Sequence, residues 1–322
     1  MILRIKFVVF LMVFTVLYCH AFPAAAIDIP GYSGMAQISD NTFLTVNDRK
    51  NPIHSGYRLG VLQVTAADGV VFTPISVRDW MDDDKDPSDL EACCRIPGRE
   101  GEFLIAESGY FNGRFGRIFH VTLFKDKEGL WSAAVNKAFR IYSRKLNAKN
   151  RSYKGDQVEG IACFHANGKT MLVYGERGGG TQGGKKVGTI VWGTINFESY
   201  RFDQLGEAPL VDQSVLGDRD CSALRLEADA DGTISVLSVA TRDADDNGPF
   251  QSALYRAGRF IIDAENKTVH FERYAKPEVI HKLSGLKVEA ISGPAGNAPD
   301  SKNSIATDDE HFGGIWRPLF GE

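Results

Sequence analysis

The feature that most constrains this chain is a pattern that recurs five times along it. Each copy has an apolar strand, a turn rich in Gly, Asn or Asp, and a second apolar strand that ends in polar residues. The five copies span residues 33–48, 90–108, 158–177, 221–243 and 288–310. A repeat at a spacing of about 60 residues is typical of architectures in which each unit buries its apolar faces against its neighbours.

The segments between these copies predict further β-strands. In each of the first four copies two more segments follow, with alternating polarity and many β-branched residues. In the first copy they cover 58–65 and 70–77. The apolar spacing of residues 131–146 suits a helix as well as a strand. Four-stranded units without helical crossovers predict an all-β fold, a five-bladed β-propeller.

The fifth copy supplies only three strands and ends with "GGIWRPLF". We expect its fourth strand to come from residues 27–32, so that the N-terminal strand closes the ring and removes the sheet edges. Two stacked sandwich domains would need a linker rich in Pro, Gly or Ser, and the sequence between the copies has none. A single propeller domain over residues 27–322 is therefore predicted.

The first 26 residues predict a secretory signal peptide. Arg4 and Lys6 precede an apolar run of about 13 residues, and Ala24 to Ala26 follow it. The run is too short to span a membrane comfortably, which argues against an anchor. We therefore expect a secreted or periplasmic protein, cleaved after Ala26, with no stable membrane insertion.

The charge balance argues against a nucleic-acid partner. The chain has 37 Lys and Arg against 41 Asp and Glu, a formal net charge of -4, and cleavage of the signal peptide makes it about −6. A general nucleic-acid or anionic-membrane binder would carry a basic face instead.

Four cysteines follow the predicted signal peptide, and their spacing matches no zinc motif. They are Cys93, Cys94, Cys163 and Cys221. In an oxidising compartment Cys93 or Cys94 could pair with Cys163, and free buried thiols are the equal alternative.

The leading residues of the five copies are expected to form a ring, because the first strand of each propeller blade lines the central channel. They are Ser33, Glu91, Glu159, Ser222 and Glu289. Three carboxylates in one narrow channel repel one another unless a cation or protons neutralise them. Oxygen ligands without His or Cys suit Ca²⁺. An axial calcium site is predicted, and a hydrated polar lining is the alternative.

A second set of polar residues is expected at the same mouth, because each second strand returns to the level at which the first began. Asp48 or Glu107 is predicted to orient an attacking water. The predicted ligand-binding residues are Arg49, Arg177, Arg242 and Asp308. Acids and arginines beside a metal suit a small anionic, phosphorylated ligand. A rim of mutual salt bridges is the alternative.

Several of these segments resemble known families. "GYSGMAQISDNTFLTVNDRKN" and "KVEAISG" resemble the first and last blades of the secreted esterase-like phytase family. "QVEGIACF" and "NGPFQSALYR" are similar to a related bacterial propeller family of unknown function. The ring order Ser, Glu, Glu, Ser, Glu resembles that of the calcium-activated nucleotidases, five-bladed apyrases with one axial calcium.

These resemblances imply calcium-dependent hydrolysis of a phosphoester or phosphoanhydride, phytase-like or apyrase-like, at the channel mouth. Little of the apyrase loop sequence is present beyond the ring positions, so the resemblance leaves the substrate open. The alternative is a non-catalytic propeller with a structural calcium. Such a module would bind a ligand at the mouth or a protein partner at the rim.

Overall fold

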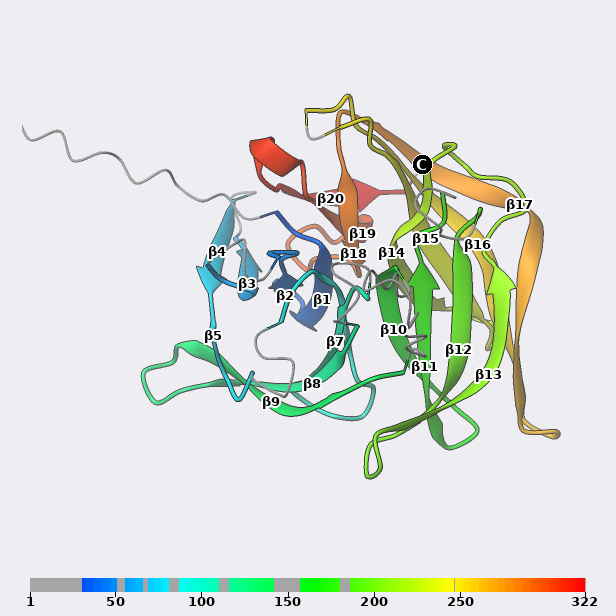
Figure 1. Cartoon of the computed structure of the whole chain (residues 1–322), viewed down its shortest axis with the longest axis horizontal. Helices are drawn as coiled ribbons and strands as arrows, with labels where there is room; N and C mark the ends of the chain where they lie inside the picture. Colours follow the sequence, from blue (N-terminus) through cyan, green and yellow to red (C-terminus); the bar gives the residue numbers. More distant parts are fainter. Residues whose placement is uncertain are drawn as a thin grey trace, which may run out of the picture.

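The computed structural model describes residues 31–50, 56–65, 69–80, 87–109, 116–141, 157–179, 186–245 and 247–321. These residues form five sheets, antiparallel except for one short parallel edge strand, arranged as a β-propeller (Figure 1), so the predicted fold class is confirmed. In this part of the chain the one helical element is a 3₁₀ turn, η3 (Glu310–Phe312), and no helix is long and apolar enough to cross a membrane. The predicted signal peptide lies outside the described residues.

Each blade follows the sequence order of its strands from the axis outward. The first contains β1 (Gly34–Ser39), β2 (Thr42–Val46), β3 (Leu59–Val64) and β4 (Val70–Pro74). The second contains β6 (Leu90–Arg95), β7 (Glu102–Glu107), β8 (Ile118–Lys125) and β9 (Trp131–Phe139). The third contains β10 (Val158–Ala166), β11 (Lys169–Glu176), β12 (Thr189–Asn196) and β13 (Arg201–Pro209). The fourth contains β14 (Arg219–Ala228), β15 (Ile234–Arg242), β16 (Gln251–Asp263) and β17 (Thr268–Ser284). The fifth contains β18 (Val288–Ser292), β19 (Ser301–Thr307) and β20 (Trp316–Phe320).

Two sequence expectations are refined. The strand expected over 70–77 is divided between two blades, because β4 ends at Pro74 and β5 (Ser76–Arg78) joins the second blade parallel to β9. Ile75, between them, is buried, and its N–H donates to the carbonyl of Leu59 at 3.2 Å. In the ambiguous segment 131–146, the first nine residues are strand β9.

The five inner strands form a closed circuit. β1 contacts β6, β6 contacts β10, β10 contacts β14, β14 contacts β18, and β18 contacts β1. A small residue follows each leading residue, as Gly34, Ala92, Gly160, Ala223 and Ala290. A Cβ added to Gly34 would lie 2.7 Å from the Cα of Ala92. Small side chains therefore let five strands approach one axis.

The predicted closing strand, 27–32, lies mostly outside the described residues. Its end is described, and there the N–H of Tyr32 donates to the carbonyl of Thr307 at 2.9 Å. The chain therefore enters the propeller beside the last residue of β19 in the fifth blade.

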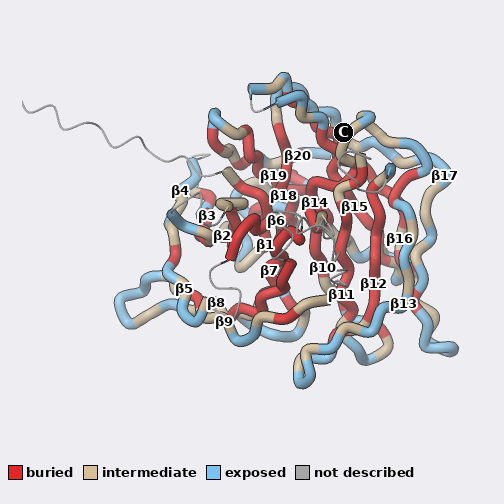
Figure 2. Tube along the Cα trace, in the orientation of Figure 1, coloured by how far each residue is buried: buried red, intermediate tan, exposed pale blue. Residues whose placement is uncertain are grey.

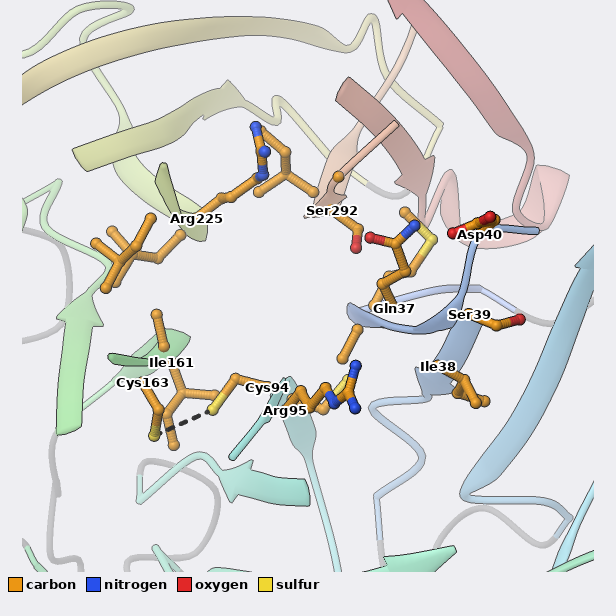
Figure 3. Close-up of a pocket in the computed structure, with 18 residues that line it drawn as sticks. Gln37, Ile38, Ser39, Asp40, Cys94, Arg95, Ile161, Cys163, Arg225 and Ser292 are labelled. Atoms are coloured by element: carbon orange, nitrogen blue, oxygen red, sulfur yellow. Dashed lines mark hydrogen bonds between the residues drawn. The ribbon is translucent and has the colours of Figure 1, made fainter. Parts of the chain in front are cut away.

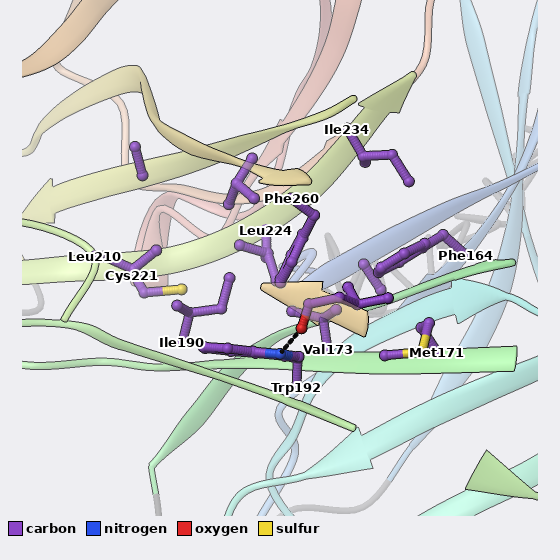
Figure 4. Packing of buried hydrophobic residues seen from close by; sticks show 14 of the residues in the cluster. Phe164, Met171, Val173, Ile190, Trp192, Leu210, Cys221, Leu224, Ile234 and Phe260 are labelled. Atoms are coloured by element: carbon purple, nitrogen blue, oxygen red, sulfur yellow. Dashed lines mark hydrogen bonds between the residues drawn. The ribbon is translucent and has the colours of Figure 1, made fainter. Parts of the chain in front are cut away.

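Apolar cores fill the spaces between neighbouring sheets, and burial falls from the inner strands to the outer ones (Figure 2). The cluster between the third and fourth blades is shown in Figure 4. There Trp192 packs edge-on against Phe260 with ring centroids 5.6 Å apart, and its Nε1–H donates to the carbonyl of Val269 at 3.2 Å. Burial of such aromatic side chains stabilises the blade interfaces and thereby fixes the axis.

Candidate functional site

The three leading glutamates stand at β-bulges. The register between the first two strands of a blade shifts at Glu91 in β6, at Glu159 in β10 and at Glu289 in β18. A bulge adds one residue to one strand and turns its side chain away from the regular pleat. The bulges thus direct three carboxylates toward the axis at the start of their strands.

A small axial cavity of about 10 Å³ is lined by four of the five predicted ring residues, Ser33, Glu91, Glu159 and Glu289. It has room for about one water-sized sphere. The Ser33 hydroxyl is buried, and among the described residues it has no hydrogen-bond partner. The fifth ring residue, Ser222, does not line this cavity.

Ser222 serves the interface between the fourth and fifth blades instead. Its Oγ donates to the carbonyl of Val288 at 2.7 Å and lies 2.7 Å from Oγ1 of Thr241. Because these contacts occupy the hydroxyl, the structure does not add Ser222 to a ligand set on the axis.

A larger cavity of about 190 Å³, here called the mouth cavity, shares the three glutamates with the axial cavity. The carboxylates among its lining residues are Asp48, Asp89, Glu91, Glu159, Glu289 and Glu310. The cations are Lys50, Arg177, Arg219 and Lys287, and the neutral polar residues are Ser108 and Gln157. Six carboxylates therefore face four cations, and full ionisation would leave two negative charges in excess.

Two fixed cations neutralise Glu289. Nη1 of Arg219 lies 2.8 Å from Glu289 Oε1, while its Nη2 lies 3.0 Å from Asp243 Oδ2. Nζ of Lys287 lies 3.2 Å from the same Glu289 oxygen and also contacts Glu310. On this side of the ring, the negative charge of the leading glutamate is therefore compensated by cationic side chains of the protein itself.

On the opposite side, Lys50 lies between acids of the first two blades. Its Nζ is 2.7 Å from Asp48 Oδ2 and 3.1 Å from Asp89 Oδ1. Asp89 has a backbone φ of 60°, a left-handed conformation that non-glycine residues adopt at an energetic cost and that is frequent at functional sites. Burial raises the pKa of the Asp89 carboxyl, and the charge of Lys50 opposes the shift.

Burial and neighbouring acids shift the pKa values of these carboxyls. Burial, and then the charges of Glu159 and Asp89, raise the pKa of Glu91 well above its usual range. Burial also raises the pKa of Glu159, although Arg177, whose Nη1 lies 3.9 Å from Glu159 Oε1, opposes the shift. Two carboxyls in contact ionise together only when a cation joins them; otherwise they share a proton.

The donors therefore fit a hard cation on one side of the ring only. Ser33, Glu91 and Glu159 offer oxygen donors, one of them an unpartnered buried hydroxyl, which suits Ca²⁺. Glu289 and Ser222 are committed to the contacts described above. Within the described ranges, no group of three or more His, Cys, Asp or Glu could hold a metal ion. The predicted five-residue ring is thus reduced to a smaller candidate set.

The second predicted set is distributed over three environments. Asp48 and Arg177 line the mouth cavity. Asp308 is buried against Gly31, and burial, followed by the charge of Glu289, raises its pKa to about 8. Arg49 and Arg242 are not among the lining residues: the first lies against Gly56, and the second is the exposed last residue of β15.

The predicted water-orienting role of Glu107 does not agree with its contacts. Glu107 is fully buried, and both of its oxygens are engaged. Oε1 accepts from the N–H of Ser88 at 2.8 Å and from Nη2 of Arg117 at 2.8 Å. Oε2 accepts from Nε of Arg117 at 2.9 Å and from the N–H of Gly116 at 3.0 Å. We therefore assign it to the structure of the second blade.

The sequence interpretation missed Lys50, Asp89, Arg219, Lys287 and Glu310. A signal for two of these residues, and for the lining residue Gln157, was present, because Asp89, Gln157 and Lys287 each precede a leading glutamate by two residues. Each inner strand begins at the mouth, so the residues just before its leading position lie at that end of the channel. This proximity along the chain would have brought three of the lining residues to the mouth.

No family model matches this chain, and no curated protein matches it. Among solved structures, it is similar to the periplasmic gluconolactonase PpgL of Pseudomonas aeruginosa, at 12% identity and a TM-score of 0.39, over 87% of this chain and 79% of that one. It is also similar to an exo-1,5-α-L-arabinanase from a bovine ruminal metagenomic library, at 10% identity and a TM-score of 0.48, over 90% of this chain and 94% of that one. The fold assignment rests on the five sheets and their closed circuit, and the site on its own geometry.

Proposed function

We propose that this chain is an exported propeller hydrolase that binds a small phosphorylated ligand in the mouth cavity, with the help of calcium, and cleaves a phosphoester or phosphoanhydride bond. The observation that carries the proposal is the lining of that cavity, where four cations lie among six carboxylates. Arginine and lysine supply the donors that phosphate oxygens accept, and acids beside them can move protons.

Arg177 is the cation best placed to turn toward a ligand. Its contact with Glu159, at 3.9 Å, is the longest ion pair among the described residues of the mouth cavity, and its side chain is 25% exposed. Arg219 and Lys287, by contrast, are held by close contacts to Glu289. A phosphate group in the cavity would therefore recruit Arg177 first, with Lys50 on the opposite wall.

The acids divide into metal-binding and proton-transferring groups. Ser33, Glu91 and Glu159 would hold the calcium, which when bound would draw negative charge from a phosphate oxygen. Asp48 would accept a proton from the attacking water as its oxygen bonds to phosphorus. Asp89, whose pKa burial raises, would give a proton to the leaving oxygen as the old P–O bond breaks. In this scheme Asp89 takes a role that the sequence had not assigned.

A substrate panel with calcium or with EGTA tests the proposal. Suitable substrates are p-nitrophenyl phosphate, ATP, ADP and inositol hexakisphosphate. We expect phosphate release that requires calcium. The substitution Arg177→Ala should lower kcat/KM by roughly 100-fold, as expected for the loss of a charged ligand contact, while the melting temperature stays unchanged. Arg242→Ala is the matched control, because that arginine is exposed outside the cavity, and it should retain full activity. A folded, calcium-loaded protein that turns over none of these substrates would reject the proposal.

A non-catalytic binding module is the second candidate. The observation that favours it is that every mouth cation already has a carboxylate within 4 Å, so none of these cations needs a substrate to balance its charge. Calorimetry with ATP and inositol hexakisphosphate distinguishes the two candidates. Binding that Arg177→Ala weakens, without turnover by the native protein, would support the binding module.

A further inference from the structure

A third cavity, larger than the axial and mouth cavities, opens at the other end of the channel. It has a volume of about 420 Å³, within the range of small-molecule sites, and is lined by residues that follow the leading positions on the five inner strands. We call it the far cavity. Cys94 from β6 and Cys163 from β10 both line it, and their sulfurs lie 3.6 Å apart (Figure 3).

We propose that Cys94 and Cys163 form a disulfide bond that cross-links the second blade to the third. We also propose that the far cavity admits the oxidant, a small molecule that itself contains a disulfide. The inner strands β6 and β10 pack against each other, so the two thiols face across an existing interface. Cys163 is the more exposed of the pair, and Cys94 is 8% exposed.

The thiols of the other two cysteines lie elsewhere, although Cys93 also contributes to the lining of the far cavity. Cys93 and Cys94 are consecutive in a strand, so their side chains point to opposite faces. The Cys93 thiol lies 3.8 Å from the carbonyl of Leu44 in the core between the first and second blades. Cys221 is fully buried, close to Gly175. Among the described cysteines, Cys94 and Cys163 are therefore the one pair whose sulfurs lie close enough to form a disulfide.

The reaction is a thiol–disulfide exchange with a small disulfide such as oxidised glutathione. The Cys163 thiolate attacks one glutathione sulfur, which breaks that S–S bond and releases one glutathione thiolate. The Cys94 thiolate then attacks the Cys163 sulfur of the mixed disulfide and releases the second glutathione. Two electrons pass to the glutathione disulfide, and the two thiol protons go to the released thiolates at neutral pH.

The cavity suits such a reagent in size and charge. Arg95, Arg225 and one acid, Asp40, line it, and the excess positive charge complements the carboxylates of glutathione. Arg95 is the more available of the two arginines, because Arg225 also contacts Asn303 and Glu227. The hydrogen bond to Cys94, together with burial, raises the pKa of the Cys163 thiol well above its usual value. Exchange should therefore be slow at neutral pH and faster as the pH rises, because the thiolate is the reacting species.

The Cys94–Cys163 disulfide would close a loop that contains β7, β8 and β9, which are the three strands outside β6 in the second blade. Cross-linking a loop of this length removes conformational freedom from the unfolded chain. For a protein of this size, the oxidised form should melt on the order of 5 °C above the reduced form.

The test compares the intact protein after equilibration with oxidised glutathione at pH 8 and after reduction. Remaining thiols are alkylated, and the unreduced digest is analysed by mass spectrometry. We expect one peptide that links Cys94 to Cys163, together with the higher melting temperature. Cys93→Ser is the matched control and should keep both results, whereas Cys163→Ser should lose both. Three outcomes would overturn the proposal in the native protein: both thiols still alkylated after oxidation, a link between Cys93 and Cys94, or only a stable glutathione adduct.

Discussion

Buried carboxyls in this protein differ in how far neighbouring cations and hydrogen-bond donors compensate their negative charge. Glu107 has Arg117 beside it, in contact with both oxygens, and backbone N–H groups supply the remaining donors. Among the described residues Asp308 has no such close partner, and burial, followed by the charges of Glu289 and Asp48, raises its pKa to about 8, although Lys287 opposes the shift. An acid whose pKa rises on folding favours the folded state only while it is protonated.

The substitution Asp308→Asn should therefore change how stability depends on pH. Below about pH 4 both states of the native protein hold the proton, and the stabilising contribution of this group is complete. As the pH rises toward 8, the unfolded chain releases the proton first, so the contribution is progressively lost. We expect the melting temperature of the Asn variant, relative to the native protein, to rise between pH 4 and pH 8 in EGTA. A difference in melting temperature between the two proteins that stays constant from pH 4 to pH 8 would contradict the raised pKa of Asp308.

At the scale of the strand, the repeats predict the blades well, and the details that build the site less well. Alternation and turn residues locate the strands, because both follow from the local sequence. The bulges at Glu91, Glu159 and Glu289 depend on how neighbouring strands pair, and a pattern read within one strand does not record this. The transfer of β5 to the next blade has the same origin, since its partner β9 lies more than fifty residues away in the chain.

Close packing of the inner strands is open to direct test at Gly160. A Cβ added there would lie 2.5 Å from Leu224 Cβ and 2.9 Å from the Leu224 backbone nitrogen. Because a backbone atom cannot turn aside as a side chain can, Gly160→Ala should lower the free energy of unfolding by about 2–3 kcal/mol. Gly321→Ala, whose new Cβ would meet its nearest neighbour at 3.5 Å, is the control and should change it by less than about 0.5 kcal/mol. Equal effects in urea denaturation would show that the inner strands are not tightly packed at this position.

At the scale of the whole molecule, the axis is where the blades depend on one another. The ring order of the sequence predicts which residues gather there, and four of the five line the axial cavity. Which charges neutralise them was not predictable from the ring alone. Arg219 is the first residue of the fourth inner strand, Lys287 immediately precedes the fifth, and Lys50 comes from beyond β2. Their convergence follows from closure of the circuit, which no single repeat contains.

Calcium would bind across three blades, since Ser33, Glu91 and Glu159 belong to the first, second and third. A ligand that binds only the folded state stabilises it by about 2.7 kcal/mol at one hundred times its dissociation constant. We therefore expect calcium, compared with EGTA, to raise the melting temperature by roughly 4 °C. Glu91→Gln should abolish this shift. Ser222→Ala should lower the melting temperature, because it removes the contact between the fourth and fifth blades, and yet retain the full shift. If the native protein melts at the same temperature with and without calcium, the axial residues form a hydrated polar channel, and the charge of the mouth is balanced by its own cations and by protons.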